Sequence, residues 1–121
     1  MIDFLQVKKE DAVYVQGHPL KTMITEIFIK LGVSDEDSAI VADILVASDL
    51  RGVDSHGVCY NIKRNYLPGI TQGKINPRPN EQLVTETAST ALIDGDRGVG
   101  HAAAFRGMNI AIKKAIETGV G

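Results

Sequence analysis

The sequence predicts an α+β fold that is rich in helix, with a helical N-terminal subdomain leading into the start of a mixed α/β layer. Three observations carry this expectation. Apolar residues recur at helical spacing through much of the first 70 positions, two short strand-like runs follow, and an amphipathic segment comes last. We therefore expect a mainly helical subdomain over residues 1–78 and the incomplete start of an α/β domain over residues 79–121.

The first two helices have the clearest signals. Residues 20–31 carry an apolar stripe with helical spacing, preceded by Pro19 and followed by Gly32, which suit a helix start and a helix stop. A second helix is expected over residues 34–50, with a serine as its N-cap and a nearly continuous apolar surface that predicts burial on several sides. Ahead of both, residues 12–15 (Ala-Val-Tyr-Val) are consistent with a short strand.

The third helix is expected from Ser55 to about Tyr66, with apolar residues four apart on one face. Pro68 should stop or kink this helix because proline lacks a backbone N–H, and residues 69–80 are then expected to form a loop. The motif around residues 54–57 falls at the start of this third helix.

The last third of the chain predicts the α/β layer. Residues 83–86 and 90–93 read as two short strands of a hairpin. The glycine-rich segment 95–100 lacks the spacing of a dinucleotide-binding fingerprint and is expected to be a tight turn. A final helix carries a stripe of apolar residues between positions 105 and 116 and ends at Gly119, and the chain stops where a further strand would be expected, which suggests a fragment.

Composition limits the classes of function. A formal net charge of −2 and a pI near 5.9 leave no basic face for nucleic acid or an anionic membrane. No apolar run is long enough to span a bilayer, and residues 1–4 do not resemble the start of a secretory signal. The lone Cys59 excludes an internal disulfide and suits a reducing compartment, so we expect a cytoplasmic protein.

The tetrapeptide Asp54-Ser55-His56-Gly57 is the strongest candidate for chemistry. Ser55 has the right position to cap the third helix, and that role alone would explain a serine. An imidazole beside a hydroxyl at a helix start is also suited to proton exchange near neutral pH, so a capping role and a catalytic role both stay open. A Cys59–His56 nucleophile pair is the less favoured reading of the same segment, and Cys59 is expected to be a half-buried helix residue.

The string from Asp49 to Val58 (Asp-Leu-Arg-Gly-Val-Asp-Ser-His-Gly-Val) resembles the signature of the malate/L-lactate dehydrogenase family of NAD(P)-dependent oxidoreductases. This family also includes L-sulfolactate and ureidoglycolate dehydrogenases and ketimine reductases, and it does not use a Rossmann fold. The resemblance keeps its register over about the last 80 residues, through Ile-Asn-Pro at 75–77, residues 86–91, residues 94–100 and residues 108–119.

This resemblance implies a function and a site. His56 would exchange a proton with the substrate hydroxyl or carbonyl oxygen of a small 2-hydroxy or 2-oxo acid, and Ser55 would belong to the same relay. NAD or NADP would exchange the hydride, and most cofactor-binding residues would lie beyond residue 121. The resemblance further implies a homodimer, with residues 79–121 starting the cofactor and substrate domain.

One position departs from the family pattern. The family often has an arginine four residues after the histidine, where a guanidinium can clamp a carboxylate. Tyr60 occupies that position here, and the nearest basic residues are Lys63 and Arg64, of which Arg64 is nearly in phase with His56. Tyr60, Asn61 and Arg64 are therefore the candidate substrate-binding residues, and the clamp role is not transferred to Tyr60.

Other residues receive simpler interpretations. His18 and His101 are expected at the surface, and Asp54, His56 and His101 match no metal-binding spacing, so no metal site is expected. The alternative to an enzyme is a non-enzymatic helical module for interaction or dimerisation, in which Ser55 only caps a helix and the apolar second helix docks a partner.

Overall fold

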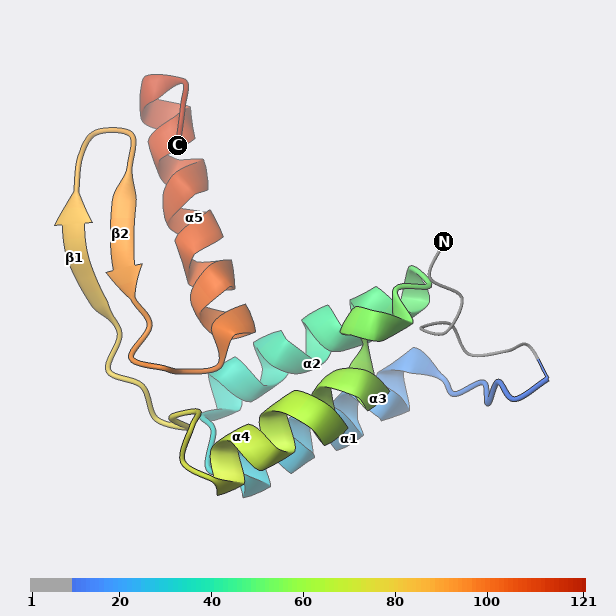
Figure 1. Cartoon of the computed structure of the whole chain (residues 1–121). Coiled ribbons are helices and arrows are strands. Elements are labelled where there is room, and N and C mark those ends of the chain that lie inside the picture. Colours follow the sequence, from blue (N-terminus) through green and yellow to red (C-terminus); the bar gives the residue numbers. More distant parts are fainter. Residues whose placement is uncertain (1–9) are drawn as a thin grey trace.

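The computed structural model describes residues 10–121, so the expectation about residues 1–4 lies outside the described part. Figure 1 shows two parts that meet at an angle: a layer of helices α1 to α4, and a unit of α5 with the hairpin β1–β2 that rises from one end of that layer. The predicted α+β, helix-rich architecture is confirmed. Among residues 10–121, no helix is long and apolar enough to cross a membrane.

Helices α1 (Gly17–Lys30) and α2 (Asp35–Leu50) pair to form the base of the helical layer. Both helices were predicted, and α1 begins slightly before the expected start. The Ser34 hydroxyl accepts a hydrogen bond from the Asp37 backbone N–H at 3.2 Å, which is the predicted N-cap of α2. Phe28 on α1 and Leu45 on α2 are fully buried in the core between them.

The predicted strand over residues 12–15 is wrong. This run has no regular structure, and the side chains of Val13 and Tyr14 are both 86% exposed. β-branched and aromatic residues favour strands only where a neighbouring strand can pair with them, and none lies beside this segment among residues 10–121.

The third predicted helix is a series of short helical segments, and its start and its end both differ from the prediction. It consists of a short 3₁₀ turn (Asp54–His56), α3 (Val58–Asn61), a π turn (Ile62–Tyr66) and α4 (Leu67–Thr71). Pro68 does not stop the helix, because it stands in the first turn of α4, where a missing N–H is tolerated after the wider π turn. The segment 69–71, expected to be loop, is therefore helical.

The hairpin and the last helix follow the prediction closely. Strands β1 (Gln82–Glu86) and β2 (Ala91–Asp94) pair antiparallel with an irregularity between Leu83 and Thr85. Helix α5 (Gly100–Thr118) lies beside this hairpin and ends at Gly119, whose φ of +85° suits glycine. Lys114 joins the two by donating to the Thr87 carbonyl at 2.6 Å and pairing with Glu86 at 2.8 Å.

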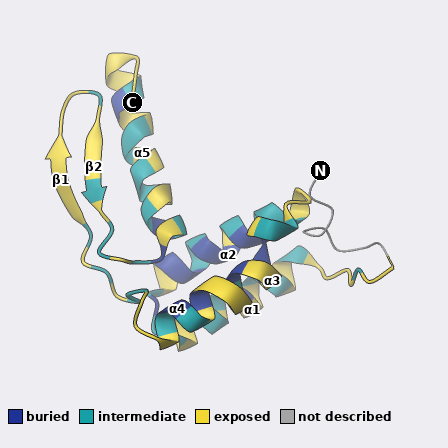
Figure 2. Ribbon diagram, viewed as in Figure 1, coloured by how far each residue is buried: buried dark blue, intermediate teal, exposed yellow. Residues whose placement is uncertain are grey.

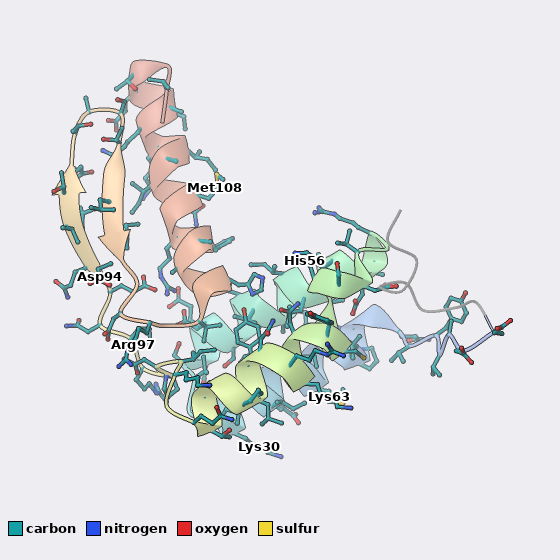
Figure 3. All side chains as sticks on the ribbon, viewed as in Figure 1. Lys30, His56, Lys63, Asp94, Arg97 and Met108 are labelled. Atoms are coloured by element: carbon teal, nitrogen blue, oxygen red, sulfur yellow. The ribbon has the colours of Figure 1, made fainter. Side chains whose placement is uncertain are left out.

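The core lies in the helical layer, and the α5 unit is largely exposed (Figure 2). On α5, Met108 is 61% exposed and stands on the side of the helix away from the hairpin (Figure 3). The other exposed members of the predicted stripe are Phe105, Ile112 and Ile116. A bridge by Arg106, at 2.5 Å from both Asp37 and Glu81, ties α5 to the helical layer.

Candidate active site

Residues 51–57, here called the elbow, connect α2 to α3 and carry the Ser-His-Gly motif. Gly52 turns the chain with a φ of +71°, and the Val53 N–H closes the end of α2 by donating to the Ser48 carbonyl at 2.9 Å. The 3₁₀ turn follows at once, closed by the His56 N–H on the Val53 carbonyl at 2.9 Å. This sharp turn presents His56 on the surface, on the side of the helical layer from which α5 rises (Figure 3).

Asp49 explains why a glycine follows the histidine. Its carboxylate accepts from the Val58 N–H at 3.0 Å, so an acidic residue of α2 caps the start of α3. A Cβ at Gly57 would lie 1.5 Å from Asp49 Oδ1, which leaves no room for any side chain there. Asp49 therefore holds the elbow in place through the first helical N–H of α3.

The predicted capping role of Ser55 is wrong, since α3 begins after Gly57 and receives no side-chain cap from Ser55. The Ser55 hydroxyl instead lies 2.9 Å from His56 Nδ1, within hydrogen-bond distance. When Nδ1 donates to the hydroxyl, Nε2 is a free acceptor and can act as a base. The pair therefore has the geometry of a side chain that orients an imidazole for proton exchange.

The three candidate substrate-binding residues have different environments. The Arg64 guanidinium lies over the Tyr60 ring, 5.1 Å from its centroid, and both side chains are exposed. Asn61 is buried, and its amide is used inside the helix, donating to the Gly57 carbonyl at 3.1 Å and accepting from Asn65 at 2.9 Å. The structure thus joins Tyr60 to Arg64, and it gives Asn61 partners within the helix.

His101 lies in a different environment from the one that the sequence predicts. It was expected at the surface, but it is half-buried near the start of α5, and its Nδ1 is hydrogen-bonded to the Tyr66 hydroxyl. Burial lowers the pKa of His101, and the nearby charge of His56 lowers it further. Burial also raises the pKa of Tyr66 to about 12. Tyr66 and His101 are 35 positions apart, so no local sequence pattern predicts their hydrogen bond. The position of Tyr66 on the apolar face of its helix was the one sign in the sequence that its ring would be buried.

The remaining predictions concern single residues. His18 is exposed on α1, as expected. Cys59 is exposed rather than half-buried. Within residues 10–121, no three His, Cys, Asp or Glu side chains are grouped so that they could hold a metal ion.

The glycine-rich segment 95–100 is the tight turn that the sequence predicts. The Gly98 N–H donates to the Gly95 carbonyl at 2.7 Å, and the Asp96 carboxylate accepts from Asn76 at 2.8 Å and from the Asn80 N–H at 2.9 Å. A Cβ at Gly98 would meet Pro79 at 2.7 Å, so close packing accounts for that glycine. The turn is thus held by its own backbone hydrogen bond and by its contacts with Asn76, Asn80 and Pro79.

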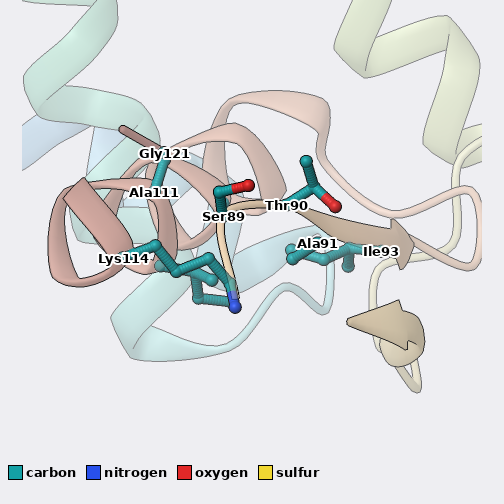
Figure 4. Close-up of a pocket in the computed structure, with 9 residues that line it drawn as sticks. Ser89, Thr90, Ala91, Ile93, Ala111, Lys114 and Gly121 are labelled. Carbon is teal, nitrogen blue, oxygen red and sulfur yellow. The ribbon is translucent and has the colours of Figure 1, made fainter. Parts of the chain in front are cut away.

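A hollow between the hairpin and α5 also lacks the features of a catalytic site (Figure 4). It is lined by small residues such as Ser89 and Ala111, together with Lys114, whose ammonium group already has partners in Thr87 and Glu86. The Ser55–His56 pair is not part of it. The relay at the elbow is therefore the candidate active site.

Known proteins that are similar to this chain are dehydrogenases. A family model described as malate/L-lactate dehydrogenase matches residues 15–121. Malate dehydrogenase from Pyrococcus horikoshii is 47% identical over 112 residues, which cover 93% of this chain and 31% of that protein. L-sulfolactate dehydrogenase from Methanocaldococcus jannaschii is 42% identical over 101 residues, covering 84% of this chain and 29% of that protein.

Solved structures give the same result. The malate dehydrogenase structure from Pyrococcus horikoshii superposes with a TM-score of 0.83 at 48% identity, over 88% of this chain and 30% of that one. The sulfolactate dehydrogenase structure from Methanocaldococcus jannaschii gives a TM-score of 0.78 at 39% identity, over 85% of this chain and 29% of that one. The chain thus spans about a third of the length of these relatives.

Proposed function

This chain belongs to the malate/L-lactate dehydrogenase family, and we propose that it forms the N-terminal part of an NAD(P)-dependent oxidoreductase acting on small 2-hydroxy and 2-oxo acids. The observation that carries the proposal is the 2.9 Å contact between the Ser55 hydroxyl and Nδ1 of the exposed His56. The names of the relatives, which are malate and sulfolactate dehydrogenases, support this substrate class.

The chain's own residues would handle the proton of the reaction. A bound nicotinamide would accept hydride from the hydroxyl-bearing carbon or return it in the reverse direction. With Nδ1 held by Ser55, the His56 Nε2 takes the hydroxyl proton as the hydroxy acid is oxidised. In the direction of reduction, the protonated imidazole returns that proton to the carbonyl oxygen.

The substrate carboxylate requires a positively charged or hydrogen-bonding partner in the site. Arg64 is a basic residue one helical turn after Tyr60, and its guanidinium stacks on the Tyr60 ring. We propose that the Tyr60–Arg64 pair contributes to the anion-binding side of the site in place of the family arginine. Asn61 contributes by holding the helix start at Gly57.

The rest of the proposed enzyme follows from the family. We propose NAD or NADP as the cofactor, with most of its binding residues beyond residue 121, in the length of the relatives that this chain does not span. Residues 1–78 would then be the subdomain that carries the relay, and residues 79–121 the start of the cofactor and substrate domain. A homodimer in the cytoplasm completes the proposal.

The test is turnover in an active enzyme that carries residues 1–121. We expect NADH- or NADPH-dependent reduction of oxaloacetate or pyruvate, and a loss of turnover of about 10²–10⁴-fold in His56→Ala. His18→Ala is the matched control, because His18 is an exposed histidine on a different helix and should keep full activity. Turnover near wild type in His56→Ala, with folding unchanged, would mean that the assignment of His56 as the proton carrier is wrong.

A further inference from the structure

The peptide that joins Gly57 to Val58, directly after the Ser-His pair, is held at both of its ends by side chains. The Val58 N–H donates to Asp49 Oδ2 at 3.0 Å, and the Gly57 carbonyl accepts from Asn61 Nδ2 at 3.1 Å. Gly57 and Val58 are both buried, where a peptide group that loses its partner is costly. One side chain from α2 and one from α3 therefore fix the plane of this peptide.

A second asparagine fixes the orientation of the Asn61 amide. Asn65 lies in the π turn, and its Nδ2 donates to Asn61 Oδ1 at 2.9 Å. A flipped Asn61 amide would set its oxygen against the Gly57 carbonyl and its NH₂ group against the NH₂ group of Asn65. Asn61 is only 8% exposed, and both polar atoms of its side chain are thus engaged inside the helix.

The same hydrogen bonds fix the backbone on both sides of His56. Before it, the His56 N–H donates to the Val53 carbonyl at 2.9 Å. After it comes Gly57, whose N–H donates to the Asp54 carbonyl at 3.2 Å and whose carbonyl accepts from the asparagine of α3. The His56 side chain is exposed, so this backbone and the Ser55 hydroxyl, 2.9 Å from Nδ1, determine where the imidazole stands.

We propose that Asn61 is a positioning residue of the relay and not a ligand of the substrate. Together with Asp49 it holds the peptide that follows Gly57, and it thereby keeps the His56 imidazole in place. This inference rests on the proposed function. Proton exchange needs the imidazole within hydrogen-bond distance of the substrate oxygen, and a displacement of about 1 Å can cost about 10²-fold in rate.

The first measurement is kinetic and uses Asn61→Asp in an active enzyme that carries residues 1–121. Aspartate has the same shape and still accepts from Asn65, but it presents an oxygen to the Gly57 carbonyl in place of an NH₂ group. The backbone N–H of residue 61 still donates to that carbonyl at 3.2 Å, so the helix start keeps a hydrogen bond. We expect kcat for reduction of oxaloacetate or pyruvate to fall about 10- to 100-fold with KM unchanged.

Two comparisons separate positioning from a loss of stability. Asp49→Asn keeps an oxygen that can accept from the Val58 N–H, so it should lose less kcat than Asp49→Ala, which removes the acceptor. Ile24→Val is the stability control, because it removes one methyl group from a core residue that is 1% exposed and should leave kcat unchanged. A raised KM with unchanged kcat in Asn61→Asp would identify a substrate ligand and overturn the proposal.

The second measurement is made by NMR on the 121-residue chain and needs no turnover. The NOE between the Ser55 Hβ protons and the His56 Hε1 proton reports the contact at Nδ1. We expect this NOE in wild type and in Ile24→Val, and we expect its loss in Asn61→Asp. Its persistence in folded Asn61→Asp would contradict the proposal. If that variant does not fold, Asn65→Ala replaces it, since it removes only the bond that orients the Asn61 amide and should weaken the same NOE.

Failure of the proposed function gives a different result. His56→Ala would then retain turnover, while the NOE between Ser55 and His56 would still be lost in Asn61→Asp.

Discussion

Asp49 and Gly57 show how two residues outside the chemistry fix the position of His56. The carboxylate occupies the space where a side chain at position 57 would stand, and it holds the first N–H of α3 at 3.0 Å. Because these two contacts fix both ends of the segment, the backbone between Asp49 and Gly57 forms the elbow. Asp49 caps α3 in place of Ser55, and the Ser55 hydroxyl contacts His56 Nδ1. The short motif thus combines one structural contact with the contact on which the proposed proton relay rests.

We expect Gly57→Ala to destabilise the chain by about 2 kcal/mol or more, because the new methyl group overlaps Asp49 and overpacking of this kind is costly. Denaturant unfolding of the chain measures the effect. Gly100→Ala is the control, since no atom lies within 4 Å of a Cβ built there. In an Asp49→Ala background the cost of Gly57→Ala should shrink, and an equal cost in both backgrounds would refute the overlap.

His101 predicts a dependence of stability on pH. Its pKa in the folded chain is lowered mainly by burial, so below the ordinary value of 6.5 the unfolded chain binds more protons than the folded one. The contribution of His101 to the free energy of unfolding is therefore complete above pH 6.5, and it is lost as the pH falls through the lowered pKa. We expect His101→Gln to lose less stability than wild type between about pH 7.5 and pH 5.5 in urea unfolding. Equal losses in the two proteins would show that His101 does not titrate in this way.

At the level of elements, the guanidinium of Arg106 is one of the groups that hold α5 on the helical layer. Arg106 contacts Asp37 at the start of α2 and Glu81 just before β1, each at 2.5 Å. The Asp37 side chain is only 9% exposed, so Arg106 supplies the pairing that a nearly buried carboxylate needs. The angle between the two parts of the molecule in Figure 1 therefore depends on a contact that has no counterpart in local sequence patterns.

Arg106→Leu should cost about 2 kcal/mol of unfolding free energy, because it leaves a nearly buried carboxylate without its partner while the half-exposed arginine limits the loss. Lys21→Leu is the comparison variant. Its ion pair with Asp43 is solvent-exposed, so its removal should cost about 0.5 kcal/mol or less. Thermal unfolding of the two variants decides, and equal losses would contradict the role assigned to Arg106.

The elements predicted well are those specified by neighbouring residues. Ser34 as a cap, the stripe of α1 and the hairpin all follow from short-range patterns, and the structure confirms them. The π turn was missed because Pro68 looks like a helix stop unless the preceding turn widens. Residues 12–15 were misread because strand propensity has no effect without a pairing partner.

The site was predicted in part for the same reason. Ser55 and His56 are adjacent in sequence, so their contact could be expected, whereas the cap by Asp49 and the bond between Tyr66 and His101 join residues 9 and 35 positions apart. Such contacts arise from packing of α2, the elbow and α5, which no periodicity describes.

At the scale of the whole molecule, several larger apolar residues of α5 are only partly covered by residues 10–121. Ile116 is 80% exposed and Met108 is 61% exposed, and the hairpin also exposes Leu83 and Leu92. Figure 2 shows that the buried residues lie mainly in the helical layer, whereas the hairpin and much of α5 are exposed or only partly buried. Since the chain spans about a third of its relatives' length, we expect the remainder of the proposed enzyme to cover these faces.

Charged substitutions on this stripe should therefore leave the 121-residue chain stable. We expect Ile112→Lys, at a position that is 49% exposed, to change its unfolding free energy by about 0.5 kcal/mol or less. Ala102→Lys is the contrasting variant, because Ala102 is fully buried, and it should prevent stable folding. A large loss in Ile112→Lys would mean that the stripe is already covered within this chain.

The most direct test of the proton relay is chemical rescue of His56→Ala in an active enzyme that carries this chain. We expect a loss of kcat of about 10²–10⁴-fold, and a partial return of turnover when free imidazole is added, because the missing group is a proton carrier beside Ser55. Near wild-type turnover in His56→Ala without imidazole would contradict the assignment of His56.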